Sequence, residues 1–544
     1  EERLGNHDIT EKQAPSHEEA AYLYAVHNQV DQQTEQMIYE SNEWFNLIQQ
    51  THIKQMATRI FDTIPKVEDS QVEGGTWLQI DRSDGYKMLV RSFPIAGIWF
   101  LAGIAKDTDT SAQEHLQKLY DDVLNANDDK QKTVHLVLQH SRKAYPALIS
   151  AEETLWKNLE FDAVGNLALS PEESEVLASA KDAATPFPLF INGRAGSGKS
   201  TVLQYLFTDY LYYFLKNQHV AKPVYFSCSN ELIKRANEVV SSLLLCSGKY
   251  WQDDNRQLLV TQNKHIIANV FKEFRSFLYS HVPENFKESF LLRNYVDYAY
   301  FRQSWEKQFK HDPIARQKYS PDVSWHVIRS YIKGTNSEFY LEPTDYQDIE
   351  QKQQTVSDET FKLVYDKVWE WYKELCNQHK LWDDQDLARL VLSENLVEPS
   401  FAAIFCDESQ DFTRLELEVI LRLSLFSNKR IESHEIRHIP FVFAGDQFQT
   451  LNPTGFRWEA TKAQFVEKFI FALETHTPDQ HNVEMNYKEL SYNFRSAPPI
   501  VRFSNIVQVL RALLFKLNSL CPQIAWGQST ANYSPVMRFS IHDK

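Results

Sequence analysis

The chain has 544 residues, of which 43% are hydrophobic and 24% are charged, and its 73 acidic residues outnumber its 57 basic ones to give a net charge of −16. These proportions are typical of a globular protein and exclude a disordered, collagen-like or membrane-spanning chain. At roughly 150 residues per domain, the length predicts three or four domains. The acidic balance excludes a broadly basic surface, so we expect any nucleic acid to bind in a local groove.

The longest apolar run extends from Phe93 to Ala105, contains Pro94, Gly97 and Gly103, and is shorter than the roughly 20 residues of a membrane span. The chain opens without an apolar signal core, so we expect neither a secretory signal nor a membrane partner. The five cysteines are scattered and form no C-x-x-C pair. This spacing argues against a disulfide framework and a zinc site, and it favours a cytoplasmic location, nucleoid-associated in a bacterium.

Residues 1–160 are expected to form an accessory α+β domain in which helices surround one hairpin. Thr76 to Ile80 and Tyr86 to Val90 alternate apolar and polar side chains on either side of Asp84-Gly85, a pair that suits a tight turn. The hairpin weakly resembles that of small RelE-type ribonuclease toxins, which would give catalytic roles to Tyr86, Lys87 and Arg91. The favoured alternative is a docking domain for a protein partner.

From Leu169 onwards, short apolar runs are each followed by small or polar residues and then by a helical pattern. Such runs are typical of buried parallel strands, so they predict an α/β sheet whose chemistry lies at the carboxyl ends of its strands. The four runs are Phe187 to Ile191, Val224 to Phe226, Ala402 to Phe405 and Phe441 to Ala444.

The roughly 170 residues between Asn230 and Ala402 are too many for one connection within a sheet, so they predict an inserted helical subdomain. The helical spacing is clearest at Phe361, Val364, Val368, Tyr372 and Leu375. We interpret the aromatic residues of this segment as core and not as stacking platforms for bases. They include Phe271, Phe274, Phe277, Trp305, Trp325, Trp369 and Trp371.

Gly193 to Ser200 matches the phosphate-binding pattern G-x-x-x-x-G-K-[ST], directly after one predicted strand and before the helical run Thr201 to Leu215. Such a loop directs backbone N–H groups at phosphates, while Lys199 reaches the β and γ oxygens and Ser200 ligates Mg²⁺. The sequence therefore predicts a bound nucleoside triphosphate with Mg²⁺. The predicted nucleotide-binding residues are Gly193, Arg194, Ala195, Gly196, Ser197, Gly198, Lys199, Ser200 and Thr201.

The third predicted strand ends in two adjacent carboxylates, Asp407 and Glu408. At a strand end both side chains can turn toward the same phosphates. We therefore expect Asp407 to hold the Mg²⁺ shell and Glu408 to activate the attacking water.

Asp407 to Asp411 reads D-E-S-Q-D and fits the D-E-x-Q-D motif of superfamily 1 helicases of the UvrD/Rep type, which the chain resembles over about three-fifths of its length. The resemblance implies a RecA-like ATPase that binds ATP, and it adds Gln410 to the catalytic residues with Lys199 and Glu408. Asp383 to Leu387 resembles the acidic stretch that precedes this motif in the family.

Three further segments fall in the family's order. The segment that ends in Ser229-Asn230 resembles motif Ia, which implies that these two residues contact single-stranded DNA. Ala444 to Gln449 resembles motif III, in which the Gln, here Gln449, links the γ-phosphate to the nucleic-acid groove. Leu490 to Ser496 resembles motif IV, which implies that Phe494 stacks on the adenine and that Arg495 is an arginine finger supplied in cis.

The chain also departs from the family pattern. Glu173 stands where the family often has a Gln that reads the adenine. Beyond Gln449 the family's aromatic-rich segment is replaced, so base stacking falls to Phe456 or Trp458, with a packed core as the alternative. Neither the T-x-H-x-x-K-G-x-E motif nor the T-R-A motif of the second RecA-like domain is found.

The resemblance divides the chain into an accessory domain (1–160), a RecA-like ATPase domain (165–260 and 396–485), a helical insertion (261–395) and the start of a second RecA-like domain (486–544). It implies an ATP-dependent helicase or translocase that moves 3′ to 5′ on single-stranded DNA, or on RNA. The alternative is a nucleotide-gated ATPase switch that signals to a protein partner without translocating, which the net charge of −16 favours.

Overall fold

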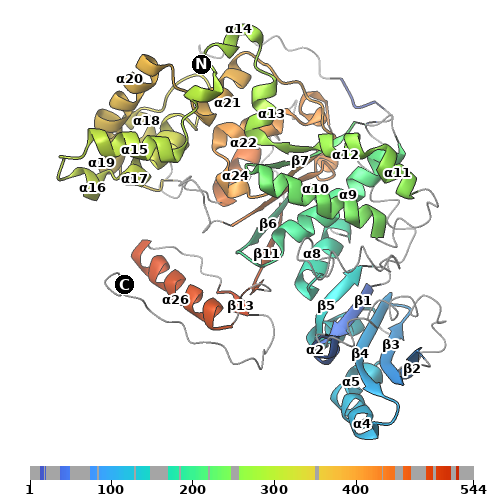
Figure 1. Cartoon of the computed structure of the whole chain (residues 1–544). Helices are drawn as coiled ribbons and strands as arrows, with labels where there is room; N and C mark the ends of the chain where they lie inside the picture. Colours follow the sequence, from blue (N-terminus) through green and yellow to red (C-terminus); the bar gives the residue numbers. More distant parts are fainter. Residues whose placement is uncertain are drawn as a thin grey trace.

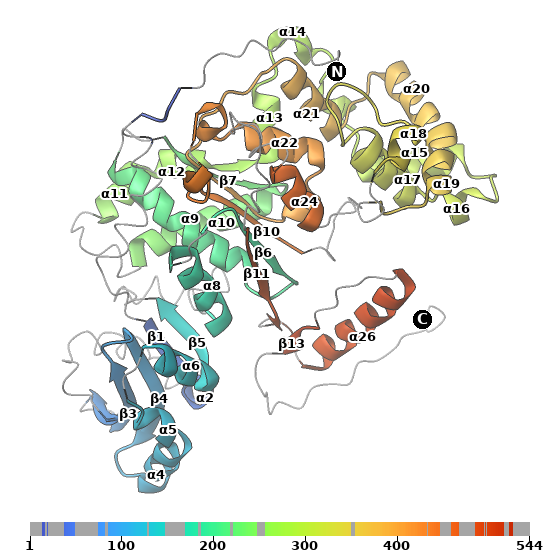
Figure 2. The ribbon, with the colours of Figure 1, turned by 180° about the vertical axis from the view of Figure 1, so that it is seen from behind.

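The structure is a computed structural model that describes residues 13–16, 19, 37–48, 74–81, 85–127, 130–146, 169–182, 186–217, 221–246, 256–349, 354–431, 433–446, 458–466, 485–493, 496, 498–515 and 522–525. Figures 1 and 2 show a central sheet covered by helices, a helical body on one side of it and a second, smaller sheet at the opposite end.

The central sheet contains six strands of the described residues, all parallel, in the order β11-β6-β10-β9-β7-β8. The predicted α/β class and the four predicted strands are therefore confirmed. Four of these strands are buried along their whole length, which is why the sequence shows them as continuous apolar runs. The strands are β6 (Leu189–Gly193), β7 (Pro223–Ser227), β8 (Phe271–Glu273), β9 (Ala403–Cys406), β10 (Phe441–Gly445) and β11 (Asn486–Leu490).

Alternate side chains of the central strands enter two cores, one on each face of the sheet. On one face Phe190 and Phe443 stack with 5.5 Å between their ring centroids. This core is closed by α13 (Phe274–Ser280), α21 (Asp384–Ser393), α22 (Arg414–Arg422) and α24 (Trp458–Phe465). On the other face Ile191 and Val442 meet α8 (Pro171–Asp182), α9 (Lys199–Lys216), α10 (Asn230–Cys246), α11 (Arg256–Gln262) and α12 (Lys264–Val270).

The helical body lies between β8 and β9 in the chain and has an aromatic-rich core of its own. The predicted helical pattern from Phe361 to Leu375 is confirmed, since α19 (Asp358–Leu363), a π-helical turn (Val364–Trp369) and α20 (Glu370–His379) follow without a break. The aromatic residues predicted as core are buried, except Trp371, which is partly buried. The other helices are α14 (Glu284–Lys287), α15 (Tyr298–Gln308), α16 (Ala315–Lys318), α17 (Pro321–Val327), a π-helical turn (Ile328–Ile332) and α18 (Pro343–Gln347).

The smaller sheet contains five strands of the described N-terminal residues, in the order β2-β3-β4-β1-β5. The predicted hairpin is confirmed, because β2 and β3 pair antiparallel with Thr76 opposite Val90. The prediction that helices surround a single hairpin is wrong: most of the apolar run from Phe93 is strand β4, whose first eight residues are all buried and so show no alternation. The elements are β1 (Met37–Ser41), α2 (Asn42–Ile48), β2 (Thr76–Asp81), β3 (Tyr86–Phe93), β4 (Ile98–Lys106), α4 (Thr110–Leu119), α5 (Asp121–Leu124), α6 (Lys130–His140) and β5 (Ser141–Pro146).

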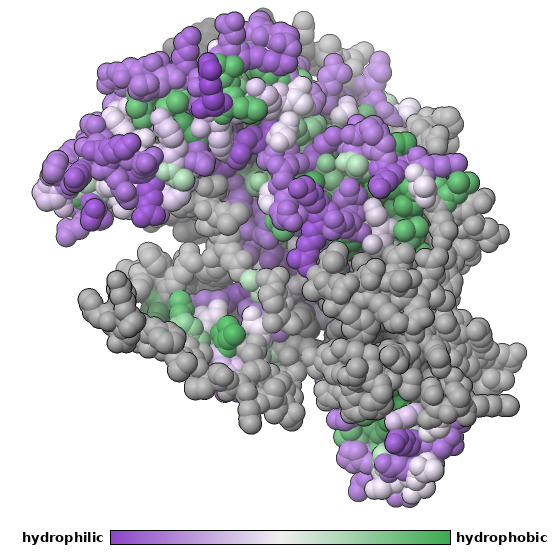
Figure 3. Space-filling model, in the orientation of Figure 1, coloured by the Kyte–Doolittle hydropathy of each residue, from purple (hydrophilic) through white to green (hydrophobic). Residues whose placement is uncertain are grey.

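Helix α26 (Pro498–Phe515) stands apart from the central sheet beside β13 (Ile524–Ala525), which pairs in parallel with β12 (Tyr492–Asn493). Apolar side chains gather on its surface, seen as green atoms in Figure 3, and include Ile500, Phe503, Ile506, Val507, Val509, Leu510 and Leu513. Among the described residues, no helix combines the length and the apolar character needed to cross a membrane.

Candidate functional site

The segment between β6 and α9 forms a tight loop at the carboxyl end of β6. The last residue of β6, this loop and the first turn of α9 contain the nine predicted nucleotide-binding residues from Gly193 to Thr201. Gly198 caps α9 with φ +89°, a conformation that favours glycine. At Gly193 a Cβ would lie 2.3 Å from Ser197 Oγ and 2.9 Å from Lys199 Cγ. The loop geometry therefore requires glycine at both positions.

Two polar side chains of the loop are buried in a way that fits an anionic ligand. Lys199 is buried, and its Nζ donates to the Arg194 carbonyl at 3.3 Å. The hydroxyl of Ser197 is buried and has no hydrogen-bond partner among the described residues. A buried ammonium group beside an orphaned hydroxyl matches the donors that a phosphate group requires.

Asp407 reaches this loop from the carboxyl end of β9. Its Oδ1 accepts hydrogen bonds from Ser200 Oγ at 3.1 Å and from the Glu408 backbone N–H at 3.0 Å, and its Oδ2 accepts from the Tyr225 hydroxyl at 2.8 Å. Burial, and then the neighbouring charge of Glu408, raise the pKa of Asp407 to about 6, although these hydrogen bonds and Lys199 oppose the rise. The two predicted Mg²⁺ ligands are thus in contact.

Glu408 is held in place by Gln410. The Glu408 backbone is left-handed, with φ +53°, which is rare for a residue with a side chain and is typical of functional sites. Gln410 Nε2 donates to Glu408 Oε2 at 2.6 Å, and Gln410 Oε1 accepts from the Asp446 N–H at 2.9 Å. Gln410 therefore fixes the predicted general base relative to the end of β10, where the predicted motif III begins.

Three consecutive residues of α8 contact three different parts of the molecule. Both carboxylate oxygens of Glu172 accept backbone N–H groups, from Ser491 at 2.8 Å and Tyr492 at 3.1 Å. The carboxylate of Glu173 lies against Gly198 of the loop. Ser174 Oγ lies 3.3 Å from the hydroxyl of Tyr39 in the smaller sheet. The helix thus joins the loop, β12 and the smaller sheet.

Glu172 is a functional candidate without a predicted role, although a local signal was present in the sequence. Ser170 to Glu173 reads S-x-x-E with Pro at the second position, which is the pattern of a capped helix start. The structure forms this capping box: the Ser170 N–H donates to Glu173 Oε2 at 2.5 Å, and the Glu173 N–H donates to Ser170 Oγ at 3.1 Å. The capping box orients α8 so that Glu172 and Glu173 face the loop and β12.

Asn493 ties β12 to the loop. Its Nδ2 donates to the Ala195 carbonyl at 2.9 Å and to Gln523 Oε1 at 3.0 Å. The two residues that follow it in the predicted motif IV, Phe494 and Arg495, lie outside the described residues, as do Gln449 and Phe456. The predicted roles of those four residues stay predictions.

Trp458 does not form a stacking platform. It is 1% exposed, its indole N–H donates to Asn192 Oδ1 at 2.9 Å, and its ring packs edge-on against Phe190 with 5.8 Å between centroids. The predicted stacking of a base on Trp458 is therefore wrong in this structure, because the ring is enclosed by the core. The alternative of a packed core is confirmed.

Ser229 and Asn230 lie where β7 gives way to α10, on the same edge of the sheet as the loop. Ser229 caps the start of α10, since its carbonyl accepts a hydrogen bond from the Ile233 N–H at 3.0 Å and its Oγ accepts one from the Leu232 N–H at 3.4 Å. Asn230 is exposed. Ser229 is partly exposed, so both side chains are accessible at this edge.

Ser200 and Asp407 fit a magnesium ion. Mg²⁺ prefers oxygen donors and is commonly held by one or two protein groups together with substrate phosphates. The loop supplies the glycine-lined cradle for those phosphates, which a Cβ at Gly193 would fill. No cluster of three or more His, Cys, Asp or Glu residues that could hold a metal by itself occurs in the described part of the chain.

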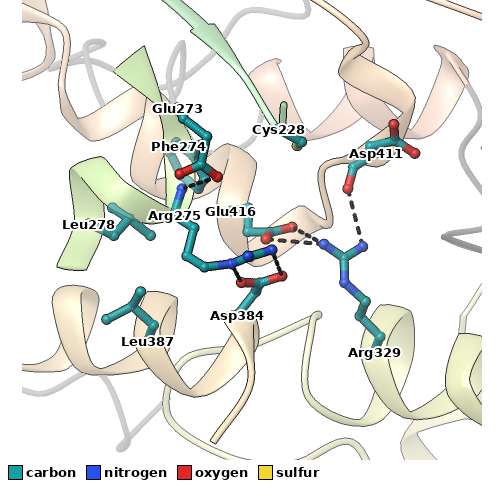
Figure 4. A pocket seen from close by; sticks show the side chains of 10 residues that line it. All are labelled: Cys228, Glu273, Phe274, Arg275, Leu278, Arg329, Asp384, Leu387, Asp411 and Glu416. Carbon is teal, nitrogen blue, oxygen red and sulfur yellow. Dashed lines mark hydrogen bonds and ion pairs between the residues drawn. The ribbon is translucent and has the colours of Figure 1, made fainter. Parts of the chain in front are cut away.

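A separate cavity of about 80 Å³ lies beyond the end of β7, where the central sheet meets the helical body (Figure 4). Four of its charged side chains form two ion pairs: Arg275 Nε lies 2.5 Å from Asp384 Oδ1, and an Arg329 amino group lies 3.1 Å from Glu416 Oε2. Arg329 also donates to the Asp411 carbonyl at 3.1 Å. This cluster joins the last residue of the D-E-S-Q-D segment to the helical body.

Comparison with models of known protein families gives no match, and a search of curated proteins finds no relative of this chain.

Proposed function

We propose that the chain is an ATPase with a RecA-like P-loop site that acts as a UvrD/Rep-like translocase or helicase on single-stranded nucleic acid, with DNA favoured over RNA. The observation that carries the ATPase part is the contact between Ser200, in the first turn of α9, and Asp407, directly after β9, because it joins two motifs that lie 207 residues apart. The motor part is supported by the order of the resembling motifs, including the segments at Ser229 and Asn493.

Under this proposal, each residue of the site has a role. The loop N–H groups and the Lys199 ammonium group bind the β- and γ-phosphates. Ser200 and Asp407 would hold Mg²⁺, which when bound neutralises charge on the phosphate oxygens. Glu408 accepts a proton from the attacking water, and Gln410 keeps the Glu408 carboxylate oriented toward that water.

Motion would be conveyed through the segment that follows β11. Asn493 contacts the Ala195 carbonyl of the loop, and Glu172 holds the backbone of Ser491 and Tyr492 beside it. A change in the phosphates would therefore displace the start of the segment that resembles motif IV. Repeated opening and closing of such a cleft moves a motor along a strand. The family resemblance gives this motor a 3′ to 5′ direction.

A second candidate function is a nucleotide-gated switch that signals to a protein partner. The observation that favours it is the contact of α8 with both Gly198 of the loop and Tyr39 of the smaller sheet. A partner bound to the smaller sheet could in this way sense the state of the nucleotide. The net charge of −16 also favours a protein partner over a long nucleic-acid track.

ATP turnover with and without nucleic acid separates the two functions. We would measure steady-state hydrolysis by the full chain alone, with single-stranded DNA and with single-stranded RNA, beside Lys199→Ala and Glu408→Gln. Strong stimulation by one nucleic acid that both variants abolish is the expected result. Turnover that is indifferent to either strand contradicts the translocase and favours the switch, and the absence of turnover dependent on Lys199 contradicts the ATPase.

A further inference from the structure

Tyr225 is a buried tyrosine in the middle of the central sheet, directly beside the strand that carries Asp407. It lies in β7, opposite Phe405 of β9 in the parallel register, and its side chain is 0% exposed. Its ring packs edge-on against Phe207, with 5.4 Å between centroids, and is tilted against Phe271 at 5.5 Å. Both neighbouring rings are phenylalanines, which offer no hydrogen-bond partner. The Tyr225 hydroxyl is therefore not needed for packing within this aromatic cluster.

The Tyr225 hydroxyl donates its hydrogen bond to the carboxylate of Asp407. The accepting atom is Asp407 Oδ2, at 2.8 Å, and the side chain of Gln204 on α9 is the other polar neighbour of the hydroxyl. Because a carboxylate oxygen can only accept, the phenol proton is directed at Asp407.

Tyr225 completes the set of donors around the Asp407 carboxylate. Oδ1 faces Ser200 and the Glu408 N–H, whereas Oδ2 is taken by Tyr225. Hydrogen bonds to both oxygens fix the plane of the carboxylate, and a fixed plane leaves the Oδ1 side turned toward Ser200. Groups that orient a metal-binding carboxylate in this way tune the affinity for the metal.

We propose that Tyr225 is a positioning residue that holds Asp407 in the orientation needed to bind Mg²⁺ together with Ser200. The inference rests on the proposed nucleotide site and goes beyond it, since Tyr225 lies in β7, outside the loop motif and the D-E-S-Q-D segment. Gln204 of α9 lies behind Tyr225 as a polar neighbour of its hydroxyl, one step further from Asp407 in this chain of contacts.

The test is the Mg²⁺ dependence of nucleotide binding by Tyr225→Phe, which keeps the ring and removes the hydroxyl. We would follow binding of a fluorescent ATP analogue to the full chain while titrating Mg²⁺, and repeat the measurement in EDTA. The Mg²⁺ concentration at half-saturation should rise about 10- to 100-fold, which is the usual effect of removing a group that orients a metal ligand. Metal-free affinity should stay unchanged.

Tyr346→Phe is the matched control, because Tyr346 is also 0% exposed and its hydroxyl donates to the Val356 carbonyl at 2.8 Å in the helical body. This variant loses an equally buried hydrogen bond and should leave the Mg²⁺ requirement unchanged. Gln204→Leu is a second variant at the site and should raise the Mg²⁺ concentration at half-saturation by a smaller factor. It replaces Tyr225→Phe in the test if that variant does not fold.

The outcomes are distinguishable. If the wild-type chain binds no nucleotide with any dependence on Mg²⁺, the proposed function is overturned. If the wild-type chain shows that dependence but Tyr225→Phe and Gln204→Leu both keep the wild-type requirement, the positioning role of Tyr225 is overturned and the proposed function stands. An equal rise in Tyr346→Phe also overturns the positioning role, because the effect would then follow from a general loss of stability.

Discussion

Gly198 and Glu173 are packed so closely that a Cβ on Gly198 would lie 1.5 Å from Glu173 Oε1. Gly198 also has φ +89°. We expect Gly198→Ala to lower the free energy of unfolding by about 3 kcal/mol, because a strained backbone and an overpacked contact each cost on the order of 1–3 kcal/mol. Nucleotide binding should be lost as the loop shifts. Urea denaturation and binding of a fluorescent ATP analogue measure the two effects.

Gly85→Ala is the control for this substitution. Gly85 also has a positive φ, +64°, but nothing lies within 4 Å of the position of its Cβ. Gly85→Ala should therefore lower the free energy of unfolding only by the roughly 1–2 kcal/mol that the strained backbone costs. Nucleotide binding should stay intact. Equal losses in both variants would contradict the close packing of Gly198 on Glu173.

Glu408→Gln should lower kcat for ATP by roughly 10²- to 10⁴-fold, the usual contribution of a general base, while nucleotide binding persists. Gln410→Ala should lower kcat by less, because it removes the hydrogen bond that orients Glu408 but leaves the base itself. In both variants the KM for ATP should change little. A raised KM with an unchanged kcat would show that these side chains bind the nucleotide and do not assist its hydrolysis.

Asp407→Asn should stabilise the nucleotide-free chain at pH 8. The folded-state pKa of Asp407, raised to about 6 chiefly by burial, exceeds the usual value of 3.8, so the folded state binds the proton more tightly than the unfolded state. The ionised carboxylate therefore costs stability at high pH, and this cost disappears as pH falls from about 6 to below 4. The gain for Asn is at most about 3 kcal/mol at pH 8.

Urea denaturation at pH 8 and at pH 4 checks the sign for Asp407→Asn. Asp107→Asn is a control at a carboxylate whose pKa is shifted the opposite way. A hydrogen bond from Gln79 and the charge of Lys87 lower the pKa of Asp107. That substitution should not stabilise the chain at pH 8. A stabilisation by Asp407→Asn that is the same at both pH values would contradict the raised pKa.

Arg329→Leu should lower the free energy of unfolding by about 3–5 kcal/mol, because it leaves the carboxylate of Glu416 buried without its ion-pair partner. The pair lies in the interior, with side chains 5% and 4% exposed. Arg302→Leu, which breaks an exposed pair with Glu306, should cause no measurable change. Thermal denaturation of the two variants side by side gives the comparison, and similar melting temperatures would contradict the prediction.

The parts of the site that could be predicted from sequence are those set by a short, contiguous segment. Gly193 to Ser200 and Asp407 to Glu408 each carry their chemistry within a few residues, and the structure brings them together as expected. The buried strands β6, β7, β9 and β10 were likewise predictable, because a strand covered on both faces is a continuous apolar run.

The parts that could not be predicted depend on contacts between distant residues. Tyr225 lies 182 residues from Asp407, and Glu172 lies 319 residues from Ser491, so no local pattern connects either pair. Strand β4 was missed for a different reason. It is buried almost throughout, so its sequence is an apolar run without alternation, and this run contains Gly103. Trp458 shows the converse error, since an aromatic residue near a motif is indistinguishable in sequence from one in the core.

Helix α8 and the segment just before it contribute to the cores of both sheets, so the two sheets cannot be separated without exposing apolar side chains. Leu169, just before α8, is 0% exposed in the core of the smaller sheet, and Leu177 packs against that core and against the core of the central sheet. A proteolytic cut ahead of Leu169 would leave one fragment without a core residue and the other with two leucines facing water. We therefore expect both sheets to melt in one cooperative transition, and isolated fragments of either to aggregate.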